Sequence, residues 1–65
     1  MNLGHLHHMV NQIARNFAIQ GHEAASAATA QHLRDFWDPR MRTQILAGDK
    51  AGLSAIALAA VEQLK

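Results

Sequence analysis

The sequence contains no cysteine, which excludes disulfides, iron–sulfur ligation and thiolate zinc sites together. It also lacks an apolar run near the roughly 20 residues that a membrane-spanning helix needs. Its first residues have neither the basic region nor the uninterrupted apolar region of a secretory signal. We therefore expect a cytoplasmic protein that contacts no membrane.

The chain has 65 residues, which is enough for a single domain spanning 1–65. A domain of this size buries only about 60% of the surface that its unfolded chain exposes, so its stability alone is marginal. Small domains usually add a disulfide, a metal or a partner. Because disulfides are excluded, the composition favours a protein partner.

Charge of either sign is scarce, with six basic and five acidic residues and a net charge of +1. Nucleic-acid binding needs a concentrated basic stripe. Only Arg34, Arg40 and Arg42 come close together, and Asp35 and Asp38 lie among them. A recognition helix presents several basic or amide side chains to the groove. We therefore expect no nucleic-acid partner, and a small helical DNA-binding regulator is the alternative interpretation.

The spacing of apolar residues predicts an all-α fold, a small compact bundle of about four short helices, at about 3–20, 22–36, 39–47 and 54–64. The apolar stripe of the first helix recurs at steps of three and four: Leu3, Leu6, Met9, Val10, Ile13 and Phe17. Gly21 and Gly48 follow apolar segments, where a helix end favours a residue that tolerates the left-handed conformation. Asp38 and Pro39 are an N-cap and a first helical residue.

The second and last helices differ in how much apolar surface they present. In the second helix one face is predicted to carry Ala25, Thr29, Leu33 and Phe36. The last helix is apolar nearly all round, and Leu58 and Val61 point away from its expected core face. A helix of this kind must be buried nearly all round, which so short a chain cannot do by itself. We therefore predict that Leu58 and Val61 contact a partner or a second copy of the chain.

The sequence predicts no catalytic, cofactor-binding or metal-binding residues. Ser26 and Ser54 lack a recognisable base, and the scattered glycines form no phosphate-binding loop. His5 and His8 could share a helix face, as two metal ligands do, but no third and fourth ligands are evident. We expect that the chain is not itself an enzyme, and a histidine-based metal-binding protein is a further, weaker alternative.

The segment from residue 33 to 42 holds the only tryptophan, the only proline and a concentration of charged residues. It is predicted to cover the core with an aromatic pair and then to begin a helix, with structural roles for Phe36, Asp38, Pro39 and Met41. Two cations lie in the first helical turn, where the dipole disfavours them by about 0.3–1 kcal/mol each. Tryptophan and arginine are also enriched among binding hot spots. Our hypothesis is that a partner with an acidic surface contacts Trp37, Arg40 and Arg42.

The same segment resembles a known family, the delta subunit of soluble NAD-dependent, molybdenum-containing formate dehydrogenase. The resemblance is carried by Phe36-Trp37-Asp38-Pro39-Arg40-Met41-Arg42, preceded by His32-Leu33-Arg34. A weaker match is Met9-Val10-Asn11-Gln12-Ile13 followed by Phe17, and Gly52-Leu53-Ser54 also fits.

This resemblance implies a non-catalytic accessory subunit that helps to assemble or stabilise the holoenzyme, with cofactor insertion as a further role. It implies that the partners are the larger formate dehydrogenase subunits and that these carry the molybdenum cofactor, iron–sulfur clusters, FMN and NAD. This chain itself is expected to hold no cofactor. The isolated chain is expected to self-associate or to be only marginally stable.

Overall fold

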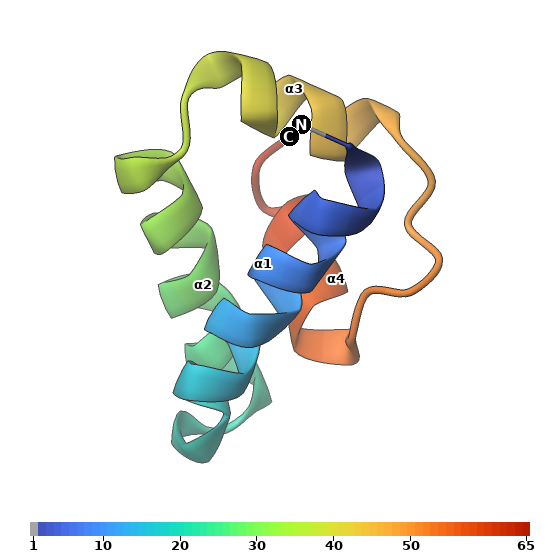
Figure 1. Cartoon of the computed structure of the whole chain (residues 1–65). Coiled ribbons are helices and arrows are strands. Elements are labelled where there is room, and N and C mark those ends of the chain that lie inside the picture. Colours follow the sequence, from blue (N-terminus) through green and yellow to red (C-terminus); the bar gives the residue numbers. More distant parts are fainter. Residues whose placement is uncertain (1) are drawn as a thin grey trace.

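The computed structural model describes residues 2–65, and all the regular secondary structure there is helical. The elements are α1 (Leu3–Phe17), the 3-10 helix η1 (Ala18–Gln20), α2 (His22–Phe36), α3 (Pro39–Ala47) and α4 (Ala55–Glu62). Helices α1 and α2 run in opposite directions, α3 crosses one end of the bundle, and α4 lies behind α1 (Figure 1). The predicted all-α bundle of four helices is confirmed.

Three of the helices begin at a side-chain cap that the local sequence specifies. Oxygen atoms of Asn2, Asp38 and Ser54 each accept a hydrogen bond from a backbone N–H three residues on, at 2.7, 2.9 and 3.2 Å. These bonds satisfy donors that the first turn of a helix leaves without an intrahelical partner. The predicted start of α3 at Asp38 and Pro39 is confirmed.

The two glycines that end helices do so for different reasons. Gly21 has a φ of 95°, in the region that favours glycine, as predicted. Gly48 has a φ of −81°, so the expectation of a left-handed residue there is wrong. A Cβ at position 48 would lie 2.7 Å from both Cδ atoms of Leu3 and 3.1 Å from the carbonyl oxygen of Gln44. At position 48 a Cβ would therefore crowd the Leu3 side chain of α1, which would have to shift to admit it.

The core receives side chains from all four α-helices. Thr29 and Ser26, buried on α2, each donate a hydrogen bond of 2.7 Å to a carbonyl oxygen four residues earlier, which satisfies their hydroxyls. Small side chains on α2 and α4 let these two helices pack closely. The buried cluster consists of Leu6, Val10, Ala14, Leu33, Trp37, Ile45, Ala57 and Val61.

The end of α2 differs from the prediction. Phe36 was expected on the core face with Leu33, but its side chain is 74% exposed, while Trp37 is 5% exposed and lies in the core. At about 3.6 residues per turn, a residue four positions after Leu33 lies closer to its direction than one three positions after it. The N–H of Trp37 still bonds to the Leu33 carbonyl at 3.0 Å, which holds Trp37 in that inward direction.

Helix α4 is also covered more completely than predicted. Val61, expected to point away from the core, is fully buried, whereas Leu58 is 38% exposed. The reason is that α4 contacts α1, α2 and α3, so its own chain covers more than one of its faces. The prediction that Val61 needs an external partner is wrong. No helix within residues 2–65 is long and apolar enough to cross a membrane.

Candidate partner-binding surface

The corner between α2 and α3 places two neighbouring aromatic residues on opposite sides of the chain. Trp37 has an extended backbone that ends α2, and Asp38 and Pro39 then begin α3. Trp37 is only 5% exposed and fills the core, so the little surface that it offers is the part that lines the groove described next, and its contact with a partner stays a prediction. Phe36 is the aromatic side chain that this corner presents outward.

Phe36 lies at the edge of an apolar groove between α1, α2 and α3. The groove has a volume of about 450 Å³. The ring of Phe36 packs against His32, with ring centroids 4.7 Å apart and planes inclined by 38°. This contact orients an exposed aromatic ring without burying it. The groove is lined by His8, Met9, Gln12, Ile13, His32, Phe36, Trp37 and Met41.

The arginines of the corner lie outside the core, as the sequence predicted. Arg40 is exposed and makes no hydrogen bond or ion pair with any residue that the structure describes. Arg42 is half-buried, and its Nη1 donates to the backbone carbonyl of Arg34 at 3.5 Å. The Nη2 of Arg34 donates to the carbonyl of Gln63 at 2.6 Å, which ties α2 to the turn after α4.

Local compensation of these arginines by neighbouring carboxylates is not observed within residues 2–65. Asp35 accepts a hydrogen bond of 2.9 Å from the side chain of Gln31, and Asp38 is used as the cap of α3. Arg34 and Arg42 instead line a second hollow of about 280 Å³ beside Leu46 and Leu64.

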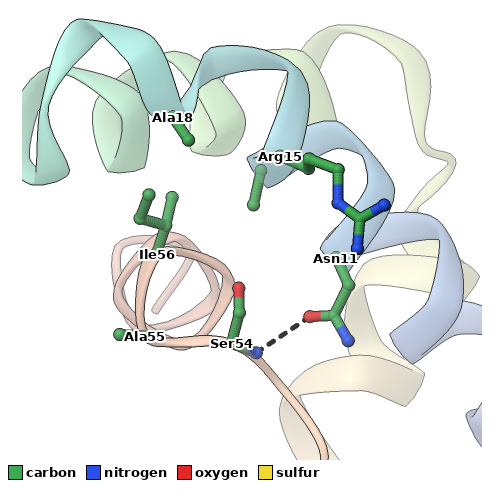
Figure 2. A pocket seen from close by; sticks show the side chains of 7 residues that line it. Asn11, Arg15, Ala18, Ser54, Ala55 and Ile56 are labelled. Carbon is green, nitrogen blue, oxygen red and sulfur yellow. Dashed lines mark hydrogen bonds between the residues drawn. The ribbon is translucent and has the colours of Figure 1, made fainter.

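A third hollow, of about 360 Å³, lies between α1 and the start of α4 (Figure 2). Asn11 reaches across it, accepting from the N–H of Ser54 and donating to the carbonyl of Gly52, both at 2.9 Å. This role of Asn11 was not predicted from the sequence. The available signal was an asparagine in a helix interior, where its backbone-bonding side chain is disfavoured.

The histidines do not assemble a metal site in the described part of the chain. No group of three or more histidine, aspartate or glutamate residues there could hold a metal ion, so His5 and His8 are not joined by further ligands. The Nε2 atom of His7 is buried without a hydrogen-bond partner.

At the other end of the chain, one surface ion pair affects a carboxylate. The Nζ of Lys65 lies 2.7 Å from the Glu62 carboxylate. The hydrogen bond and charge of Lys65 lower the pKa of Glu62 below its ordinary value. Both side chains are well exposed, so this pair is a surface feature rather than part of a site.

The family model for the NADH-dependent formate dehydrogenase delta subunit, FdsD, matches residues 5–61. The chain belongs to this family. The match covers the segment from Phe36 to Arg42 and every residue that lines the apolar groove, and it confirms the resemblance on which the sequence interpretation rested. As a delta subunit, the chain is one component of a multisubunit formate dehydrogenase. No curated protein and no solved structure matches it.

Proposed function

We propose that this delta subunit is a non-catalytic accessory subunit that binds the larger subunits of a cytoplasmic NADH-dependent formate dehydrogenase and helps to assemble or stabilise them. The proposal takes the type of complex, an NADH-dependent formate dehydrogenase, from the family to which the chain belongs. The proposal includes a role in cofactor insertion, with the molybdenum cofactor, iron–sulfur clusters, FMN and NAD held by the larger subunits.

The observation that carries the proposal is the position of Phe36. A large aromatic side chain that is 74% exposed lies on the rim of an apolar groove, already oriented by His32. Burying a phenylalanine side chain against a partner contributes about 1.5–3 kcal/mol. Pre-orientation reduces the entropy that binding would otherwise cost. Phe36 and the groove therefore have the properties of an anchor for another protein.

The chemistry of the chain supports an accessory rather than a catalytic role. With no cysteine, it cannot supply thiolate ligands to an iron–sulfur cluster. The hydroxyl of Ser26 donates to the carbonyl of His22, and that of Ser54 caps α4, so both are engaged in local structure. Within residues 2–65, no hydrogen bond joins either serine hydroxyl to a basic side chain that would activate it as a nucleophile.

Leu58 and Val61 of α4 were predicted to contact a partner, and of these two residues only Leu58 is partly exposed. We retain it as a second contact position, together with Arg40, which is exposed. Self-association of the isolated chain through the face of α4 that carries Leu58 stays a prediction.

The test is co-expression of the larger subunits with the wild-type chain, Phe36→Ala or Ile19→Ala. Ile19 is a matched control because its apolar side chain is 96% exposed and lies in η1, outside the groove. We expect Phe36→Ala to reduce the amount of delta subunit that copurifies and the molybdenum content of the complex, and Ile19→Ala to change neither. If the wild-type chain, Phe36→Ala and Ile19→Ala copurified in equal amounts, Phe36 would not be the anchor. A wild-type chain that does not copurify with the larger subunits would refute the proposal.

A further inference from the structure

We infer that the hollow lined by Arg34 and Arg42 binds an acidic segment of a larger formate dehydrogenase subunit, taking a carboxylate and an adjacent apolar side chain. We name this hollow the arginine pocket; its lining is Arg34, Pro39, Arg42, Thr43, Leu46 and Leu64. The inference rests on the proposed function for the identity of the partner. The chemistry of the occupant follows from the pocket itself.

A backbone carbonyl holds the Arg34 guanidinium group at the pocket, and a second carbonyl makes a longer, weaker contact with that of Arg42. Arg34 bonds to the Gln63 carbonyl at 2.6 Å, and Arg42 bonds to the Arg34 carbonyl at 3.5 Å. A guanidinium group carries five N–H donors in a rigid planar fork. One bond to a carbonyl leaves the other donors of each arginine for a ligand. The fork geometry matches the two oxygens of a carboxylate.

The positive charge at this end of α3 is not neutralised by an ion pair within residues 2–65. The nearest carboxylates in the sequence, Asp35 and Asp38, bond to Gln31 and to the α3 backbone. The first turn of α3 contains Arg40 and Arg42 and no acidic residue, at the positive end of the helix dipole. The Asp38 cap offsets part of the dipole, but Arg34 and Arg42 form no ion pair within residues 2–65, so charge complementarity favours an anionic ligand such as a carboxylate.

Apart from Thr43, the rest of the pocket lining is apolar, which favours a protein segment over a nucleic acid. Leu46 and Leu64 are half-buried and contribute apolar surface beside the guanidinium groups, and Pro39 adds a rigid ring. The phosphate backbone of a nucleic acid would make no favourable contact with this apolar surface. Nucleic-acid binding also needs a basic surface more extended than the corner between α2 and α3. A leucine-sized side chain next to an aspartate or glutamate uses both parts of the pocket.

The test is a titration of labelled delta subunit into formate dehydrogenase subunits purified without it, at low and at high salt. We expect Arg42→Gln to weaken binding about tenfold at low salt and to reduce its salt dependence, because a charge-assisted contact is lost. Arg42→Glu should weaken binding further. The matched control is Arg15→Gln, since Arg15 is exposed on α1 and its side chain makes no hydrogen bond or ion pair within residues 2–65; it should bind as wild type does.

A second pair of variants tests the pocket without removing an existing contact. Thr43 is exposed at the pocket, so Thr43→Glu places a carboxylate where the ligand would bind, and Thr43→Gln is its neutral counterpart. We expect Thr43→Glu to weaken binding about tenfold relative to Thr43→Gln, with unchanged helical circular dichroism in both.

The outcomes separate the inference from the proposed function. If the wild-type chain does not bind the larger subunits, the proposed function fails and the inference fails with it. If the wild-type chain binds and neither the Arg42 variants nor Thr43→Glu weaken binding, only the arginine pocket is overturned. An equal loss with Arg15→Gln would show a general charge effect and would also overturn it. If Arg42→Gln lowered the affinity of the chain for DNA in a separate titration, and left its affinity for the larger subunits unchanged, the inference would also be overturned.

Discussion

Asn11 and Ser54 lie 43 residues apart in the sequence, yet the N–H of Ser54 donates to Oδ1 of Asn11 at 2.9 Å. The same amide donates from Nδ2 to the carbonyl of Gly52 at 2.9 Å. The Asn11 side chain of α1 therefore bonds both to the loop before α4 and to Ser54, the N-cap residue of α4. Figure 2 shows the bond to Ser54. In a chain of this size, such a bond sets the position of the last helix relative to the first.

Replacing Asn11 by alanine should lower the free energy of unfolding by about 1–2 kcal/mol, because two hydrogen bonds are lost and the Gly52 carbonyl loses its partner. Urea denaturation measures this change. Asn16→Ala is the control, since Asn16 is exposed on the same helix and its side chain makes no hydrogen bond or ion pair within residues 2–65. Equal losses in the two variants would mean that the Asn11 bonds do not stabilise the fold.

Truncation of the two neighbouring aromatic residues should change the free energy of unfolding by very different amounts. Trp37→Ala should lower the free energy of unfolding by about 3–5 kcal/mol, because it leaves a cavity in the core. Phe36→Ala should change it by no more than about 0.5 kcal/mol, as is usual for exposed positions. Thermal unfolding followed by circular dichroism compares the two. A large loss of stability in Phe36→Ala would contradict its exposure and its assignment as a partner contact.

Two glycine substitutions should change the free energy of unfolding in opposite directions. Gly21 has a φ of 95° and a ψ of 159°, a region that only glycine adopts readily, so Gly21→Ala should cost about 1–3 kcal/mol. Gly4 lies within α1, and a Cβ there would lie 3.5 Å from the nearest atom, an ordinary contact. Gly4→Ala should raise the free energy of unfolding by about 0.5 kcal/mol. Chemical denaturation of both variants checks the signs, and stabilisation by Gly21→Ala would contradict the backbone geometry.

The ion pair at the end of α4 predicts a pH effect. Lys65 lowers the pKa of Glu62 in the folded chain below its ordinary value of 4.5. The pair therefore adds to stability above that ordinary value, and the contribution disappears as the pH falls through the lowered pKa. Because both groups are exposed, the contribution is small. In Lys65→Met the pKa of Glu62 should rise toward its ordinary value, which carboxyl titration by NMR measures; an unchanged pKa would show that Lys65 is not the cause.

Several features of the site could be predicted from local sequence because they depend on neighbouring residues. Asp38 and Pro39 specify the start of α3 through a cap and a fixed φ, so Arg40 and Arg42 fall in its first turn. The motif around them also identified the family that the comparison confirmed. What lies beneath the arginines could not be predicted, since Arg34 and Leu64 reach the same pocket from distant parts of the chain.

The sequence by itself determined the four α-helices, the family and, to within about three residues, the helix ends, because caps, breakers and apolar spacing act over a few residues. The first helix was predicted to reach residue 20 and the last to span 54–64, but α1 ends at Phe17 before a 3-10 turn, and α4 spans Ala55–Glu62. Only the tertiary structure decided that Trp37 rather than Phe36 enters the core, that Val61 is covered by its own chain and that Asn11 holds the loop before α4. These outcomes depend on which helices pack together, and side-chain burial is a property of that packing rather than of the pattern along one helix.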